Sequence, residues 1–292
     1  MIAAQKTQPR TLADWLAQCG WQPRDRLRSV FTLDTDSGEA VLSRLPALSK
    51  SQWNSWTLES PFLPIPDLQE LFAANREIQG PFKYTVTGED EILCAGDVPR
   101  EALVTEDSYD LGSGRSSSPI ECWARSATAL AKGETPALDH AKPTAESQVE
   151  WLKEHGFVAS SDREAVKVTV PLTGTFREIT VSFEDGRMVH LSAEIGRIKD
   201  WPAPSREAAV DFLGEANSPL RLIRIAEADE PFVYRMEARF CAPGPGVWLQ
   251  AALDAFCTGM ALVVQPLATL RDPGVADMLL AGKTARRKGG AS

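Results

Sequence analysis

The pattern of hydrophobic and polar positions is clearest in the second half of the chain. Apolar residues recur at three-to-four spacing in 143–155 and again in 205–216, which predicts two amphipathic helices. Between these helices, apolar and polar residues alternate, as they do in half-buried strands. The strands expected there are 166–170, 179–183 and 188–191. Because short turns join them, they predict an antiparallel meander.

Two more strands and a closing helix complete this half. Asn217-Ser218-Pro219 ends the second helix, and the alternating segments 220–226 and 232–240 follow it. A glycine–proline turn then leads into 247–263, which is apolar enough for a long buried helix. The element order is therefore α-β-β-β-α-β-β-α, a twisted antiparallel sheet flanked by helices.

The first half of the chain repeats this order. Helices are expected at 12–19, 66–79 and 120–132, and strands at 26–34, 39–45, 53–58, 81–86 and 91–95. The segment Trp15–Gly20 corresponds to Trp151–Gly156, since both hold Trp-Leu and end in a glycine that closes a helix. Asn75 in the middle helix corresponds to Asn217 in the second half. A repeat of this length predicts an α+β fold made of a tandem pair of such domains.

The repeat also suggests where the domains begin and end. We expect the first domain at 1–132 and the second at 144–272, with 133–143 as a linker that contains Pro136. The last segment, 273–292, is basic and ends in Gly, Ala and Ser residues, so we expect it to form a disordered tail.

The order of elements resembles that of the class I type III secretion chaperones and of the YbjN-like proteins, which share one fold. The residues that carry the resemblance are the two openings, Trp15-Leu16…Gly20 and Trp151-Leu152…Gly156, and the meander before helix 205–216. The resemblance implies a non-enzymatic protein that holds an extended segment of a client protein on its surface. Such chaperones are single domains that dimerise, whereas this chain is a tandem. It therefore implies either a monomer with an internal pseudo-twofold axis or a homodimer.

Composition and charge narrow the range of partners. The formal net charge is −9 and the pI is about 5.0, so a basic face for nucleic acid is not expected. No sequence window has the uninterrupted apolar length of a membrane span, and the first residues do not resemble a signal peptide. The five cysteines are widely spaced and form no CxxC motif, which favours reduced thiols. We expect a cytoplasmic protein that binds neither nucleic acid nor membrane.

Few residues offer catalytic chemistry. Of the three histidines, His140 lies in the expected linker, His155 at a helix end, and His190 in a strand with no nucleophile spaced to pair with it. Residues 112–118 are rich in Gly and Ser but lack the Gly-Lys-Ser/Thr ending of a phosphate-binding loop. We therefore expect no catalytic residue, no bound cofactor and no metal site.

The eight tryptophans are better candidates for recognition, because exposed aromatic residues bind partner chains well. Trp53 and Trp56 are three apart on an expected strand, so one should be buried and the other exposed. Trp201 lies in a proline-bracketed loop, and Trp248 opens the last expected helix. These four residues are the predicted partner-binding candidates.

The pattern as a whole favours a protein- or peptide-binding module without catalysis. Its partner would be a segment of a client protein, bound by apolar and aromatic side chains and by pairing along a sheet edge. Two alternatives remain open: a small-molecule enzyme with its site between the two copies, and a structural or regulatory subunit of an assembly. An enzyme would have a cleft with converging charged groups, whereas a binding module would have an exposed apolar patch.

Overall fold

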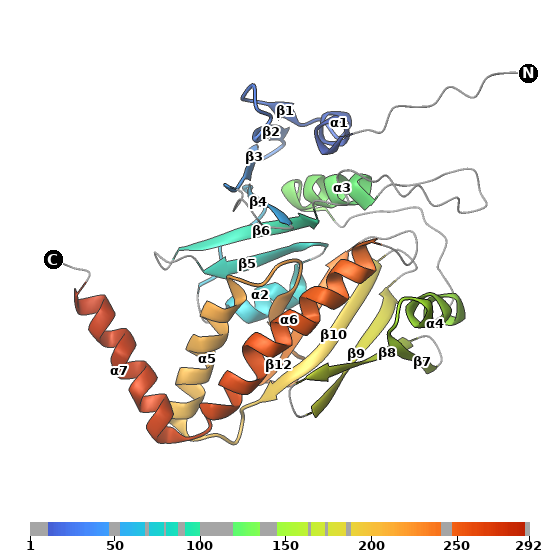
Figure 1. Cartoon of the computed structure of the whole chain (residues 1–292). Helices are drawn as coiled ribbons and strands as arrows, with labels where there is room; N and C mark the ends of the chain where they lie inside the picture. Colours follow the sequence, from blue (N-terminus) through green and yellow to red (C-terminus); the bar gives the residue numbers. More distant parts are fainter. Residues whose placement is uncertain are drawn as a thin grey trace, which may run out of the picture.

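A computed structural model describes residues 11–46, 53–67, 70–78, 80–86, 91–99, 119–134, 145–162, 165–172, 175–184, 188–240 and 247–289. It contains two six-stranded antiparallel sheets and their flanking helices, so the tandem α+β fold is confirmed (Figure 1). Below, unit 1 denotes α1 to α3 and unit 2 denotes α4 to α7.

Unit 1 begins with a short helix and ends with another that covers its sheet. Its elements are α1 (Leu12–Gln18), β1 (Gln22–Pro23), β2 (Val30–Thr35), β3 (Gly38–Arg44), β4 (Trp53–Glu59), α2 (Leu71–Glu77), β5 (Phe82–Val86), β6 (Ile92–Pro99) and α3 (Pro119–Ala131). The strand order is β1-β2-β3-β4-β6-β5. Thr11 and Asp14 form a capping box that starts α1, and Gly20 with φ of 96° follows its end.

Unit 2 has the same order of elements, followed by one further helix. They are α4 (Ala145–Glu154), β7 (Val158–Asp162), β8 (Ala165–Leu172), β9 (Thr175–Glu184), β10 (Met188–Arg197), α5 (Ala203–Asn217), β11 (Arg224–Glu227), β12 (Val233–Phe240), α6 (Val247–Thr269) and α7 (Pro273–Gly289). The order β7-β8-β9-β10-β12-β11 matches that of unit 1 strand for strand.

Each sheet has one strand more than the sequence pattern predicts. The additional strands, β1 and β7, lie at the outer edges and pair with β2 and β8. β1 is only two residues long, and β7 is serine-rich without apolar alternation, so neither carries the usual strand pattern.

The expectation of a disordered C-terminal tail is wrong for 273–289, which form α7. The segment is rich in Ala, Leu, Lys and Arg, which are strong helix formers. α7 contacts α5 (Figure 1), where the ammonium group of Lys283 lies 3.2 Å from Asp211 and 3.0 Å from Glu215. These contacts fix a segment whose composition alone suggested a solvated tail.

Aromatic side chains form the centre of unit 1. The ring of Trp56 lies 6.0 Å from that of Phe31 and 6.3 Å from that of Trp123 in α3, and Phe82 lies 5.2 Å from Trp123. Burial of this cluster between α3 and the sheet holds the unit together.

α6 covers the sheet of unit 2 (Figure 1). Among the described residues, α6 is the one helix that is long and apolar enough to cross a membrane by length and composition. Its mean hydropathy is 1.5 over Leu249–Thr269. It contacts β8, β10 and β12, and Leu253, Phe256 and Val263 are buried, so core packing accounts for part of its apolar composition, with 39% of the apolar window buried.

Candidate functional site

Of the four tryptophans predicted to bind a partner, the structure describes the side chains of three. Trp56 is 4% exposed and packed in the aromatic core, as expected for one of the two tryptophans on this strand, so its ring is not open to a partner. Trp53, on the same strand, is half-buried, as is Trp201 before α5 in the other unit. The side chain of Trp248 lies outside the described residues.

A hollow of about 690 Å³ lies in unit 1 where β4 separates from β6. β4 stays paired with β3 up to Glu59, but its pairing with β6 ends at Thr57 and Ala95. We call this space the β4–β6 hollow. Its apolar lining includes Val41, Leu58, Leu63, Ile65, Ile92 and Leu93. A volume of this size is typical of sites that bind small molecules.

Tyr84 and Cys94 also line this hollow, and neither is activated for catalysis. Burial raises the pKa of Cys94 to about 12, and burial together with Cys94 raises that of Tyr84 to about 12. At neutral pH both groups stay protonated, so the thiol is a weak nucleophile and the phenol is no base.

Three carboxylates stand at the rim of the β4–β6 hollow. Glu39, Glu59 and Glu91 line it and are all exposed. Glu39 forms an ion pair with Arg24 of β1's flanking loop. Within the described residues, Glu59 and Glu91 have no cationic partner, so the rim carries net negative charge beside an apolar interior.

A second, smaller hollow of about 360 Å³ lies between α1 and α3, beside Cys19, Arg125 and Thr128. Burial raises the pKa of Cys19, so this thiol is not activated either. Within the described ranges, no three His, Cys, Asp or Glu side chains lie close enough together to hold a metal ion.

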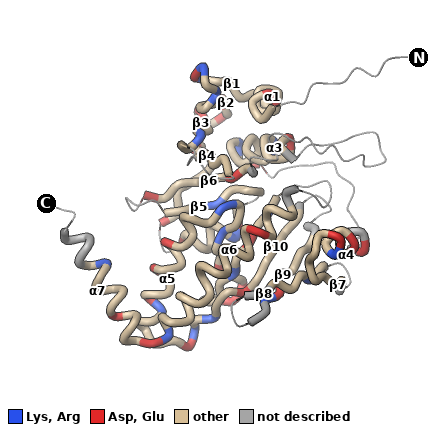
Figure 2. Tube along the Cα trace, in the orientation of Figure 1, with Lys and Arg blue, Asp and Glu red and all other residues tan. Residues whose placement is uncertain are grey.

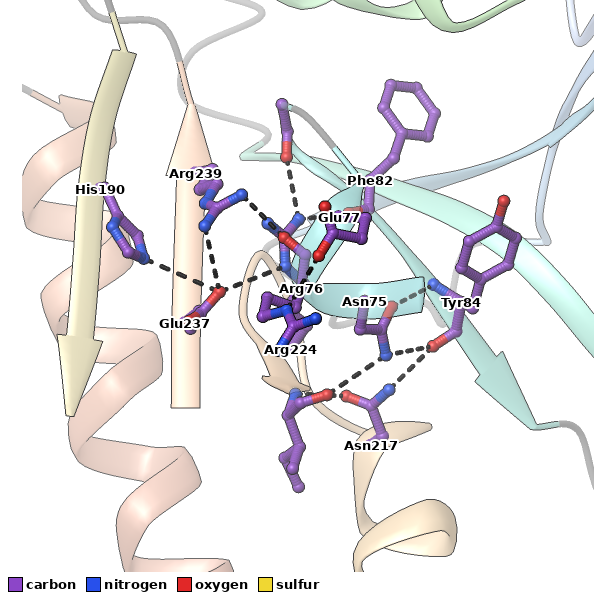
Figure 3. A network of polar contacts seen from close by, with 12 residues as sticks. Asn75, Arg76, Glu77, Phe82, Tyr84, His190, Asn217, Arg224, Glu237 and Arg239 are labelled. Atoms are coloured by element: carbon purple, nitrogen blue, oxygen red, sulfur yellow. Dashed lines mark hydrogen bonds and ion pairs between the residues drawn. The ribbon is translucent and has the colours of Figure 1, made fainter. Parts of the chain in front are cut away.

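The two units meet through paired asparagines at their inner edge strands (Figure 3). Asn75 of α2 accepts a hydrogen bond from the Tyr84 amide of β5 and donates to the carbonyls of Tyr84 and of Ile225 in β11. Asn217 of α5 accepts from the Ile225 amide and donates to the Tyr84 carbonyl. Each asparagine therefore binds its own unit's edge strand and that of the other unit, which is the reciprocity of an isologous interface.

A buried basic residue directly precedes Tyr84 on β5 and Ile225 on β11, and each one binds main-chain carbonyls of the other unit. Lys83 of β5 donates to the carbonyls of Asn217, Leu220 and Ile223 at 2.7, 2.5 and 3.3 Å. Arg224 of β11 donates to the carbonyls of Gly80 and Phe82 at 3.2 and 2.8 Å. Burial lowers the pKa of Lys83 to about 7, against the opposite effect of Asp97.

Glu237 organises the cations on the unit 2 side (Figure 3). Its carboxylate is buried and lies 3.7 Å from His190, 3.9 Å from Arg224 and 3.8 Å from Arg239. Burial by itself raises the pKa of Glu237, but the nearby His190 and the two guanidinium charges outweigh it and lower the pKa. Arg239 in turn donates to the Arg76 carbonyl of α2 at 2.9 Å, so this cluster links the two units.

The sequence reasoning missed both the β4–β6 hollow and this interface. The hollow results from the separation of two strands, which leaves no mark in the hydrophobic pattern. For the interface, the matching of Asn75 with Asn217 was visible, but which strands these side chains bind was not. The signal available was a pair of polar residues on the otherwise apolar faces of two corresponding helices.

Figure 2 shows that Lys and Arg are interspersed with Asp and Glu along the described parts of both units. Comparison with protein-family models and with curated proteins finds no match to this chain. The candidate site therefore stands on its geometry.

Proposed function

We propose that this chain is a non-enzymatic binding module that holds a segment of a partner protein in the β4–β6 hollow. The observation that carries the proposal is an apolar hollow with exposed carboxylates at its rim and a protonated thiol and phenol inside. Such a site offers contact area and charge complementarity, and its thiol and phenol are not activated for catalysis. The resemblance to secretion chaperones, which hold client segments, agrees with this role.

The alternative, a small-molecule enzyme with its site between the units, has weaker support. The buried polar groups at that interface, Lys83, Arg224 and the two asparagines, are engaged with main-chain carbonyls and amides of the opposite unit. Groups held in this way contribute to the association of the units and are not directed at a substrate. Both hollows described above are lined by residues of unit 1 alone.

Site-specific photo-crosslinking in cells tests the proposal. A photoreactive residue replaces Leu93, which lines the hollow, and in a matched variant it replaces Leu262, which is exposed on α6 of unit 2. We expect one protein to be captured from position 93 and not from 262. A second substitution that fills the hollow, Val41→Trp, should abolish the capture, and the purified partner should bind the wild-type chain at a one-to-one ratio.

Equal capture from both positions, or capture that persists in the filled variant, would overturn the proposal. Native mass spectrometry of the purified chain provides the complementary observation. A small molecule that co-purifies with the wild type and is lost with Val41→Trp would favour the small-molecule alternative.

A further inference from the structure

Among the described residues, the strand separation that opens the β4–β6 hollow has no counterpart at the matching place in unit 2. The paired asparagines identify Tyr84 of β5 and Ile225 of β11 as corresponding residues. Tyr84 pairs with Cys94 and Ile225 pairs with Met236, so Cys94 and Met236 also correspond. The last β4–β6 pair, Thr57 with Ala95, therefore matches Ser192 with Glu237. In unit 2 the strand pairing continues past this point, through a bulge between Glu194 and Gly196, to Arg197 and Val233, so β10 and β12 do not separate there.

The charges at the matching place also differ. Glu59 of the hollow corresponds to Glu194 in unit 2, which lies 3.4 Å from the guanidinium of Arg197. That guanidinium also binds Glu230 at 2.5 Å. Glu59 and Glu91 lack such a cation among the residues that the structure describes. At this place unit 1 therefore combines an open apolar space with unneutralised carboxylates, whereas in the described part of unit 2 the strands stay paired and Glu194 is neutralised.

We infer that the β4–β6 hollow selects segments in which apolar side chains are flanked by Lys or Arg, and that each chain has one such site, in unit 1. This inference rests on the function proposed above and adds the chemistry of the partner. Apolar side chains would occupy the space between Val41 and Leu93, and the flanking cations would lie beside Glu59 and Glu91. Acidic segments of the same shape would be repelled, which provides discrimination between partners.

Three fluorescent peptides test the charge selection. They share the same apolar residues and differ only in flanking Lys, Gln or Glu, and their binding to the full chain is followed by fluorescence anisotropy. We expect the Lys peptide to bind most tightly and to weaken severalfold as the salt rises from about 50 to about 300 mM, because salt screens exposed charges. For the double variant Glu59→Gln/Glu91→Gln, affinity for the Lys peptide should fall by about fivefold, to that of the Gln peptide.

The matched control is Glu194→Gln in unit 2, which should leave binding unchanged, and the fitted stoichiometry should be one peptide per chain. Thermal unfolding verifies that both variants remain folded. Equal affinity for all three peptides, or an equal loss with Glu194→Gln, overturns the inference and leaves the crosslinking result of the proposed function intact. Failure of every peptide to bind also overturns it, whereas absence of a crosslinked partner at position 93 overturns the proposed function itself.

Discussion

At the scale of single residues, buried polar side chains of unit 1 and unit 2 satisfy main-chain groups that sheet pairing leaves open. β5 and β11 are inner edge strands, and edge strands present unpaired amides and carbonyls. A carboxamide has the same donor and acceptor as a peptide group, so Asn75 and Asn217 replace the missing neighbouring strand. The repeat in the sequence matched these two residues with each other. It did not predict their hydrogen bonds, because bonds between residues far apart in the sequence leave no local pattern.

Asn75→Ala should lower the free energy of unfolding by about 2–4 kcal/mol, because the buried Tyr84 amide and the buried Ile225 carbonyl would lose the hydrogen bonds that Asn75 makes with them. Urea unfolding followed by circular dichroism measures this change. Gln250→Ala serves as a control. The Gln250 side chain donates an exposed hydrogen bond to Asp254 one turn later in α6, so its loss should change stability little. A loss for Asn75→Ala no larger than that of the control would contradict the interpretation.

Lys83 should make stability depend on pH above neutrality. Its pKa is about 7 in the folded protein, below its usual value of 10.5, because the ammonium is buried. Between these two values the unfolded chain binds more protons than the folded one. The free energy of unfolding should therefore rise from about pH 7 to about pH 9, by at most about 1.4 kcal/mol per pH unit.

Urea unfolding at several pH values measures this slope. Lys83→Met removes the titrating group, so the rise should disappear in that variant even though its overall stability is lower. A rise of the same size in the variant would assign the effect to another group.

At the scale of elements, the sequence predicted those with strong periodicity and missed those formed by tertiary context. The alternating strands and the amphipathic helix that became α5 were expected near their observed positions. β1 and β7 were missed because an edge strand needs only a partner and no apolar pattern of its own. α7 was missed because basic residues at a chain end suggested a solvated tail, while Asp211 and Glu215 of α5 bind Lys283.

Glycines in two elements should respond to substitution in opposite directions. A Cβ added at Gly96 in β6 would lie 2.7–3.0 Å from the Phe82 ring, so Gly96→Ala should destabilise the protein by about 1–3 kcal/mol. A Cβ added at Gly282 in α7 would meet nothing within 4 Å, so Gly282→Ala should stabilise by up to about 1 kcal/mol. Thermal unfolding of both variants measures the two effects. Loss of stability on Gly282→Ala would indicate that α7 is not a helix at that point.

At the scale of the whole molecule, the two units are joined by buried charge as well as by hydrogen bonds. Arg224 and Arg239 reach the main chain of unit 1, and Glu237 lies within 4 Å of both. The fold of each unit followed from its hydrophobic pattern. Their mode of association did not, because it depends on which polar side chains become buried together.

Glu237→Gln should destabilise the chain by about 1–3 kcal/mol, since two buried guanidiniums would lose their counter-ion. Because the pKa of Glu237 is lowered in the folded protein, the stabilisation that it provides is present above its unfolded value of 4.5 and is lost as the pH falls below it. Urea unfolding at neutral and acidic pH measures both effects, with the exposed Glu207→Gln as the control. Identical pH profiles for wild type and Glu237→Gln would exclude this role.

The reciprocal contacts of Asn75 and Asn217 also bear on how such a chain can diverge. In a homodimer every substitution occurs twice, so a change that helps one side of the axis must be tolerated on the other. Here Asp97 accepts a hydrogen bond from the Leu222 amide, while the matching position holds Arg239, of opposite charge, which donates to Arg76. Because one covalent chain carries both halves, dilution does not separate them, and each half is free to specialise.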